Sequence, residues 1–320
     1  MDHSLLTVRV ATKKEEALGV SSFELIAPDG GSLPPFSAGA HIDVYGPTGI
    51  VRQYSLCNHP SERTRYLIAV LRDPKSRGGS AAMHDQVQVG DIIRISAPRN
   101  LFPLAQGARR SLLLAGGIGV TPILCMAEHL SDGDAAFEMH YFARSRERTA
   151  FQARIAQAAF RKSVAFHFDD EPSGQKQDIA TLLASQDEDT HLYVCGPGGF
   201  LDAVLNAARA QQWPAEHIHY EYFGATAKTG QNLPFSVRIA SSGAIYAIAA
   251  DKSVVAALSV QGVEIAVSCE QGICGTCLTR VLAGEPDHRD QFLSNEERAA
   301  NNQFLPCCSR ARSPMLVLDL

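Results

Sequence analysis

The chain has 320 residues, of which 45% are hydrophobic and 20% are charged. These values are those of a globular protein and exclude a disordered chain, and the length exceeds a single core, so we expect two or three domains. The net charge of −5 favours neither nucleic acid nor an anionic membrane as a partner.

The start of the chain contains no basic segment followed by a long apolar one, so no signal peptide is predicted. The longest uncharged stretch, residues 111–127, contains three glycines and a proline and is shorter than a membrane span. We therefore expect a cytoplasmic protein, in which thiols stay reduced. Its eight cysteines are then better interpreted as ligands or small buried hydrophobes than as disulfides.

The first hundred residues predict an antiparallel β-barrel. Short, often alternating segments are separated by Gly, Pro and Asp, which is typical of β-strands. These segments are residues 5–13, 21–28, 40–46, 65–73 and 91–98. We expect a small closed barrel over residues 1–106.

Two stretches inside this region carry polar groups that could bind a ligand, and the second has the chemistry of an anion site. Residues 52–55, RQYS, combine a cation, an aromatic ring and a hydroxyl group. Residues 78–80, GGS, offer amides and a hydroxyl group at the start of a helical turn predicted to reach His84, which suits an anion. Taken alone, R-x-Y-S is also compatible with an ordinary strand of a β protein.

Residues 107–228 predict a doubly wound parallel α/β sheet. An apolar strand at 111–115 leads into the glycine turn 116–119 and a helix that starts near Thr121. Residues 191–213 repeat the order of strand, Gly/Pro turn and amphipathic helix, with a strand at 137–145 and a helix at 151–160 between the two. Such sheets bind ligands beyond the carboxyl ends of their strands, where both glycine turns would lie. We therefore expect a nicotinamide dinucleotide there, although the first turn does not match G-x-G-x-x-G and is weak evidence alone.

The third region, residues 233–320, contains Cys269, Cys274 and Cys277 in a C-x4-C-x2-C pattern, followed by a distant cysteine. This is the plant-type spacing for a 2Fe–2S cluster. Gly272 and Gly275 let the chain pass close to the cluster without a Cβ. Zinc is the competing interpretation, but zinc motifs usually contain two C-x2-C knuckles and only one is present here.

The sequence around these cysteines predicts an α+β domain. Alternation at residues 235–239 and 244–248 indicates a strand pair, and a helix is predicted at 253–261. A short strand is expected to enter the ligand loop, and another to follow it from Cys277 onward. The whole region resembles the β-grasp fold of ferredoxins.

The three regions in this order resemble the phthalate dioxygenase reductase family, which includes the reductases of vanillate-type O-demethylases. The resemblance covers essentially the whole chain and rests on RQYS, GGIGVTP, CGPGGF and the cysteine pattern. It implies FMN as the flavin, NADH as the donor and a Rieske-type oxygenase as the electron acceptor. An adenine-side extension, expected for FAD, is not evident.

The resemblance also implies a reaction. A hydride carries two electrons, whereas an iron–sulfur cluster takes one at a time, and a flavin bridges this mismatch. The chain would therefore take a hydride from NADH onto FMN and pass single electrons through the 2Fe–2S cluster to the oxygenase.

Individual roles follow from the same resemblance. Tyr54 would stack on the flavin ring, Ser55 would bond its polar edge and Arg52 would meet the phosphate. The family spacing of twenty-nine residues after the third cysteine selects Cys307 as the last cluster ligand and leaves Cys308 beside it. The expected metal ligands are therefore Cys269, Cys274, Cys277 and Cys307.

Thr121 and Cys195 would line the nicotinamide pocket, and Phe223 would cover the flavin or nicotinamide. The expected catalytic residues are thus Tyr54, Ser55, Thr121, Cys195 and Phe223. The expected cofactor-binding residues are Arg52, Gln53, Tyr54, Ser55, Val70, Leu71, Gly78, Gly79, Ser80, Gly116, Gly117, Gly119, Thr121, Arg144, Cys195, Gly196, Pro197 and Phe223.

Alternatives stay open at this point. Arg144 and Arg146 follow the second strand of the nucleotide sheet and would admit NADPH. The acceptor could instead be a free ferredoxin or a quinone, whereas a free-flavin reductase would not need the cluster. A non-enzyme alternative is a zinc-stabilised module on a nucleotide sensor.

Overall fold

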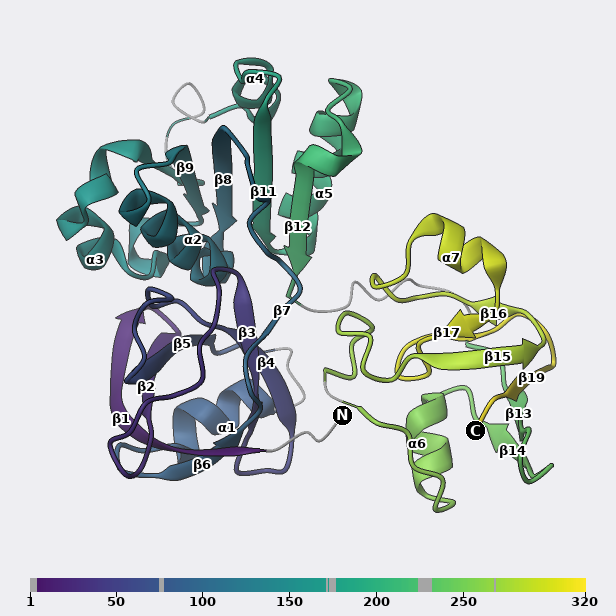
Figure 1. The fold of residues 1–320 in the computed structure, drawn as a ribbon. Coiled ribbons are helices and arrows are strands. Elements are labelled where there is room, and N and C mark those ends of the chain that lie inside the picture. Colours follow the sequence, from purple (N-terminus) through teal and green to yellow (C-terminus); the bar gives the residue numbers. More distant parts are fainter. Residues whose placement is uncertain (1–4, 75–77, 171, 173–176, 224–231, 268) are drawn as a thin grey trace. The chain divides into compact units, whose positions relative to one another are not determined.

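The structure is a computed structural model that describes residues 5–74, 78–170, 172, 177–223, 232–267 and 269–320. It consists of two compact units, Met1–Phe223 and Gly224–Leu320, called here the first and second units (Figure 1). The expected end of the nucleotide domain at residue 228 lies outside the described residues. Within the described ranges, every helix is too short or too polar to cross a membrane.

The first unit begins with an antiparallel sheet that curls on itself, as predicted. Its strands are β1 (Leu6–Ala17), β2 (Val20–Ile26), β3 (Ala40–Tyr45), β4 (Val51–Ser55), β5 (Arg65–Leu71), β6 (Ile92–Ile95) and β7 (Arg99–Asn100). They pair in the order β4-β3-β6-β1-β2-β5, and β7 pairs with β3. A bridge between Leu56 and Ile68 joins the two edges, and the N–H of Cys57 donates to the carbonyl of Leu67 at 2.8 Å.

Alternate residues of these strands fill the inside of the curl. Val8, Phe23, Ile42 and Ile68 are completely buried there, which explains the alternating pattern that predicted the strands. The helix α1 (Gly79–Gln86) adds Met83 to this core. The loop that carries the GGS motif is therefore anchored to the barrel by an apolar side chain.

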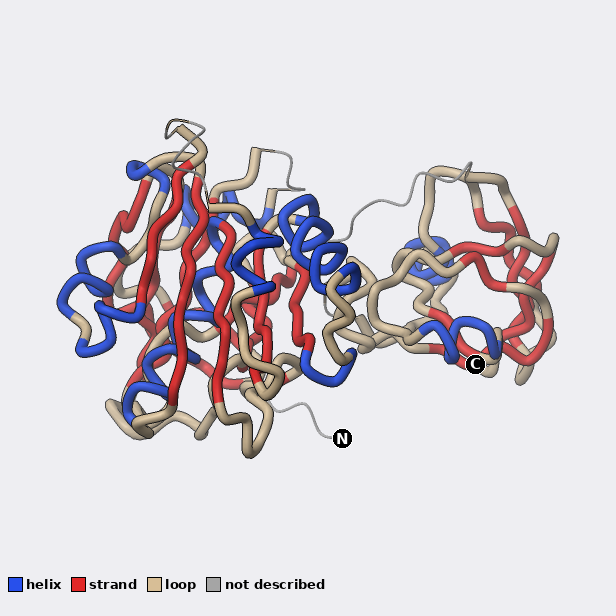
Figure 2. Tube along the Cα trace, turned by 90° about the horizontal axis from the view of Figure 1, so that it is seen from above, coloured by secondary structure: helices blue, strands red, loops and turns tan. Residues whose placement is uncertain are grey.

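The second half of the first unit is a five-stranded parallel sheet. Its strands are β8 (Arg110–Gly116), β9 (Ala136–Ala143), β10 (Val164–Phe168), β11 (Thr190–Gly196) and β12 (Ile218–Tyr222), in the order β10-β9-β8-β11-β12. Its helices are α2 (Val120–Asp132), α3 (Gln152–Gln157), α4 (Ile179–Ala184) and α5 (Gly198–Ala210). Figure 2 shows helices on both flanks of the strands.

Two cores cover the two faces of this parallel sheet. Leu112 and Leu114 face α4 and α5, whereas Leu113 and Ala115 face α2. The α2 core continues into the barrel through buried residues such as Leu67. Because barrel and sheet share this core, they form one unit.

One helix in this half is shorter than expected. The sequence predicts a helix over 151–160, but α3 ends at Gln157 and a 3-10 helix follows at Ala159–Ser163. Ala158 between them has extended backbone angles, with φ −70° and ψ 150°. The break allows Phe160 to turn into the core, where it is 8% exposed.

The second unit contains a mixed sheet with one helix packed into its core. Its strands are β13 (Phe235–Ile239), β14 (Ile245–Ile248), β15 (Thr279–Ala283), β16 (Pro286–Asp287), β17 (Gln303–Phe304), β18 (Arg310–Ala311) and β19 (Met315–Leu318). The sheet order is β14-β13-β19-β15-β17, and β16 pairs with β18. The helices are α6 (Val254–Ser259) and α7 (Asn295–Ala300).

Two local expectations for this unit need correction. The helix α6 is shorter than predicted because Ser253 caps its N-terminus, accepting from the N–H of Ala256, and Gly262 follows its end with φ +78°. The strand expected to enter the ligand loop is absent at 263–267, and Ser268 lies outside the described residues. The segment is irregular because Ile265 packs against both apolar cores of the unit.

Candidate functional sites

The two glycine turns of the nucleotide sheet touch each other. A Cβ on Gly119 would lie 2.1 Å from the carbonyl oxygen of Cys195, and one on Gly196 would lie 2.9 Å from the Cα of Gly116. No side chain fits at these distances, so the turns meet backbone to backbone. β8 and β11 are the neighbours at which the strand order reverses, and in such sheets ligands bind in the crevice at this point.

The helices α2 and α5 both start at this crevice. The 3-10 helix Gly117–Gly119 leads directly into α2, and Pro197 precedes α5. The N–H of Val120, the first residue of α2, already donates to carbonyl groups of the 3-10 helix. The helix α5 has no side-chain hydrogen bond at its N-cap, so its start is the one suited to a phosphate. The hydroxyl group of Thr121 donates to the carbonyl of Ile118 at 3.1 Å, and the residue is buried.

The structure also brings together the RQYS and GGS motifs of the barrel. A Cβ on Gly79 would lie 3.1 Å from Cγ and 3.3 Å from Nε of Arg52, so this side chain runs beside the start of α1. Gly78 has φ +96°, which favours glycine. The hydroxyl group of Ser80 accepts from the N–H of Asp73 at 3.2 Å. A guanidinium group thus lies beside a helix start, and this combination suits a phosphate.

Tyr54 carries a buried polar atom that a flavin could satisfy. Its ring packs against the barrel core, and burial raises its pKa to about 12. Its hydroxyl group is buried and finds no hydrogen-bond partner among the described residues. Buried hydroxyl groups in native proteins are normally bonded, so this atom indicates a missing partner.

Gln53 belongs to a network of polar side chains in the barrel. The Gln53 amide bonds Asp43 at 3.1 Å and His41 at 3.2 Å, and Arg99 holds Asp43 at 2.7 Å. Burial lowers the pKa of His41 to about 4. This polar network beside the RQYS motif gave no signal in the sequence, because its members come from three separate segments.

Val70 and Leu71 lie at the end of β5, the first buried and the second exposed. The carbonyl of Val70 is bonded to Nε2 of His84 at 2.9 Å, so the end of β5 is tied to α1.

Ser55 connects the barrel to the edge of the nucleotide sheet. Its hydroxyl group donates to Oε2 of Glu221 at 3.5 Å, and Glu221 stands opposite Cys195 in the pairing of β12 with β11. Burial raises the pKa of Glu221 to about 8 and that of Cys195 well above its usual value. A carboxyl group that exchanges a proton near neutral pH is typical of functional sites. Sequence reasoning missed Glu221, although its neighbour Phe223 was singled out.

The remaining predicted residues lie at strand ends on the same edge. Phe223 directly follows β12 and is 42% exposed. Arg144 follows β9 and is exposed. The guanidinium group of Arg146 lies 4.8 Å from the centre of the Phe168 ring, so a cation–π contact already engages it.

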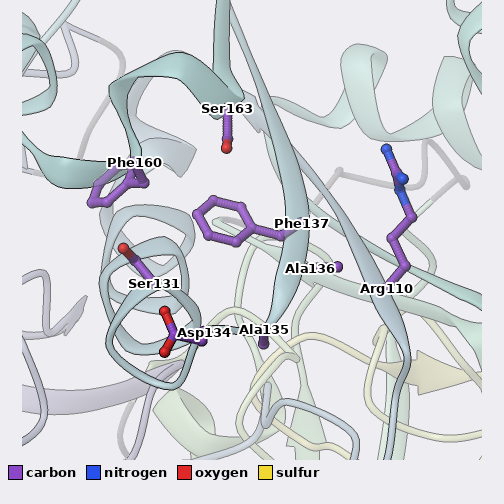
Figure 3. A pocket seen from close by; sticks show the side chains of 8 residues that line it. All are labelled: Arg110, Ser131, Asp134, Ala135, Ala136, Phe137, Phe160 and Ser163. Carbon is purple, nitrogen blue, oxygen red and sulfur yellow. The ribbon is translucent and has the colours of Figure 1, made fainter.

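A pocket of about 320 Å³ opens at the opposite edge of the sheet (Figure 3). Arg110 and Phe137 line it near the amino ends of β8 and β9, together with Asp134 and Phe160. A dinucleotide bound at the glycine turns would lie at the carboxyl ends of the same strands. The pocket is therefore separate from the candidate nucleotide site.

In the second unit, the four predicted cluster ligands form two pairs. Cys274 lies beside Cys269, and Cys277 beside Cys307, and in each pair the neighbouring thiol lowers the pKa of the first-named cysteine. One thiol of each pair is thus disposed to ionise, as a metal ligand must. Two thiol pairs suit a core of two irons, each taking two thiolates.

A single zinc ion fits this arrangement less well. One zinc ion would draw all four thiols to a single point, whereas here they lie in two pairs. The loop also provides donors to sulfur, since the N–H of Gln271 points to Sγ of Cys269 at 3.3 Å. The residues present therefore fit a 2Fe–2S cluster.

Gly272 and Gly275 shape the loop as predicted, with φ +75° and +71°. A Cβ on Gly272 would lie 2.4 Å from Sγ of Cys308, and one on Gly275 would lie 2.3 Å from the ring of Phe292. The thiol of Cys308 therefore packs against the back of the ligand loop. It bonds the carbonyl of Leu305 at 3.7 Å.

Comparisons with known proteins agree with this arrangement. Residues 237–312 match the family model of the 2Fe-2S iron-sulfur cluster binding domain, and residues 93–218 match that of the N-terminal domain of the dimethylamine monooxygenase subunit DmmA-like proteins. The vanillate O-demethylase oxidoreductase of Pseudomonas putida is 58% identical over 313 residues, which cover 97% of this chain and 98% of that protein. The tetrachlorobenzoquinone reductase of Sphingobium chlorophenolicum is 41% identical, with 99% and 98% covered.

A solved structure of phthalate dioxygenase reductase, described as modular for electron transfer from pyridine nucleotides to [2Fe-2S], is 40% identical. It matches with a TM-score of 0.81 over 99% of this chain and 98% of that one. These likenesses extend over both units. The chain is therefore an oxidoreductase with a 2Fe–2S domain and belongs to the phthalate dioxygenase reductase family.

Proposed function

We propose that this chain is the cytoplasmic reductase component of a Rieske-type oxygenase or O-demethylase, with FMN as its flavin and NADH as its donor. The observation that carries the proposal is the contact between Ser55 and Glu221. It joins the flavin motif to the nucleotide sheet within one unit, while the second unit supplies thiol pairs for a one-electron centre. The relatives that resemble the whole chain are reductases.

The flavin phosphate would lie between Arg52 and the start of α1 at Gly78, Gly79 and Ser80. Tyr54 would stack on the flavin ring, and Ser55 would face its polar edge. FMN, when bound, would accept a hydride and release its electrons singly. The apolar core shared by barrel and sheet would keep the two ligands in a fixed orientation.

The dinucleotide would lie across the touching glycine turns, with its phosphates at the start of the 3-10 helix Gly117–Gly119 and on the first N–H groups of α5. Gly116, Gly119 and Gly196 allow the close backbone approach, and Pro197 fixes the start of α5. Cys195 and Phe223 would border the nicotinamide. We assign NADH rather than NADPH because Arg146, one of the two arginines that would admit a 2′-phosphate, already stacks on the ring of Phe168.

The carboxyl group of Glu221 would hold a proton beside Ser55. With a pKa near 8 it is mostly protonated at neutral pH and can exchange that proton with the Ser55 hydroxyl group. This arrangement places a proton donor at the flavin motif.

The test is reconstitution with the oxygenase component of a vanillate O-demethylase and vanillate. We expect NADH consumption that depends on the oxygenase and yields demethylated product in proportion. If the rate of NADH oxidation did not depend on the oxygenase, the proposed partner would be contradicted. The P. putida relative motivates this choice of partner, since its name states that reaction.

A second candidate acceptor is a quinone, favoured by the 41% identity to a tetrachlorobenzoquinone reductase. The same assay with tetrachlorobenzoquinone in place of the oxygenase separates the two. We expect a lower kcat/KM for the quinone than for the oxygenase, and the reverse order would make the quinone the substrate.

A further inference from the structure

The second unit buries a carboxylate next to the ligand loop. Asp290 is 1% exposed, and its side chain has no exposure at all. A buried carboxylate costs several kcal/mol unless bonds compensate it. Oδ2 accepts from the N–H of Leu293 at 2.9 Å, and Oδ1 accepts from the hydroxyl group of Ser309 at 3.3 Å.

An arginine and a histidine accompany this carboxylate. Nη2 of Arg298 lies 3.7 Å from Oδ2 and donates to the main-chain carbonyl of Asp290 at 2.6 Å. Nδ1 of His288 lies 3.7 Å from Oδ1. The charge of Asp290 is thus partly balanced by Arg298, which is itself partly buried.

Hydrogen bonds connect the segment around Asp290 to both parts of the cluster site, the ligand loop and the turn that carries Cys307. Ser309 follows Cys307 by two residues, and its hydroxyl group accepts from the N–H of Arg289 at 3.1 Å. On the other side, the N–H of Gln291 donates to the carbonyl of Gly272 at 2.9 Å. A Cβ on Gly272 would lie 3.0 Å from the Cα of Asp290. The segment 288–291 therefore lies between the loop with three cysteines and the turn that carries the fourth.

We propose that Asp290 is a positioning residue that ties the two ligand-bearing segments together, and that its buried charge lowers the reduction potential of the 2Fe–2S cluster. The proposal rests on the proposed function, because it assumes the cluster. A fixed negative charge beside the cluster disfavours the added electron, and neighbouring charge and burial are among the determinants of cluster potential. A low potential would make the reduced cluster a stronger donor to its partner.

The test is a redox titration of the cluster in the complete, iron-loaded protein, with chemical mediators and no NADH. Asp290→Asn keeps the size and one acceptor oxygen but removes the charge, so the cluster potential should become more positive. At a fixed ambient potential, the ratio of reduced to oxidised cluster should rise several-fold. Arg298→Gln removes the balancing cation and should shift the potential in the opposite direction.

Glu285→Gln is the matched control. Glu285 also pairs with an arginine, Arg312 at 3.2 Å, but its side chain is 53% exposed, so solvent screens its charge. We expect its cluster potential to equal that of the wild type. If the two residues acted through packing alone, Asp290→Asn and Arg298→Gln would shift the cluster potential in the same direction or leave it unchanged. Either result would overturn the proposal.

If the Asp290→Asn protein does not retain a cluster, the Arg298→Gln variant decides. A more negative cluster potential in that variant supports the proposal, and any other result rejects it. A wild-type protein that holds no cluster after iron loading would contradict the proposed function and this inference with it. If the wild-type protein holds a cluster but neither substitution changes the cluster potential, this inference alone is contradicted.

Discussion

Glu221 is the residue in which burial and chemistry are most closely linked. Burial raises its pKa from the usual 4.5 to about 8, so the folded state binds a proton that the unfolded state has released. Between about pH 4.5 and 8, stability should therefore fall as pH rises, by up to about 1.4 kcal/mol per pH unit. In Glu221→Gln, unfolding monitored by denaturant over this range should lose most of that slope. A variant with an unchanged slope would show that Glu221 is not the titrating group.

Cys307 and Cys308 are adjacent in sequence but differ in their surroundings. Cys307 pairs with Cys277, whereas the thiol of Cys308 packs against Gly272 and bonds the carbonyl of Leu305. Cys307→Ser should lose nearly all bound iron and the visible absorbance of the cluster, and Cys308→Ser should keep both. Iron analysis and absorbance spectra check this, and the reverse pattern would identify Cys308 as the fourth ligand.

At the scale of elements, the contact between the glycine turns after β8 and β11 holds the nucleotide edge together. Gly119→Ala would place a Cβ against the carbonyl of Cys195, so the turns must separate. We expect a loss of about 1–3 kcal/mol in the free energy of unfolding, as for overpacking, and at least about tenfold in kcat/KM for NADH. Gly133→Ala, with only ordinary contacts beyond 3.7 Å, is the control and should change neither quantity. Equal effects in both variants would contradict the account.

Elements with a strong period could be predicted from the sequence, whereas those fixed by distant packing could not. Alternation and glycine turns located β1, β2, β8 and β11, and the cysteine spacing located the cluster loop. The break at Ala158 depends on the burial of Phe160, and the missing strand at 263–267 depends on Ile265 contacting two cores. Glu221 and Asp290 gave no signal in the sequence, because the role of a single carboxylate depends on the distant segments that bury it.

At the scale of the whole molecule, the shared core of barrel and parallel sheet predicts that the first unit functions alone. A chain ending at Phe223 should fold, bind FMN and reduce ferricyanide with NADH at a rate close to that of the full chain. It should transfer no electrons to an oxygenase, since the thiol pairs belong to the second unit. Stopped-flow absorbance and the oxygenase assay measure the two properties. A truncated chain that still drives the oxygenase would remove the need for the cluster.

The division into two units also defines the central claim, that electrons enter as a hydride in the first unit and leave singly through iron in the second. The direct measurement is an anaerobic titration of the flavin- and iron-loaded protein with NADH, followed by absorbance and low-temperature electron paramagnetic resonance. The account predicts bleaching of the flavin band together with the signal of a reduced 2Fe–2S cluster. An iron-loaded protein whose flavin band and iron signal both stay unchanged by NADH would contradict it.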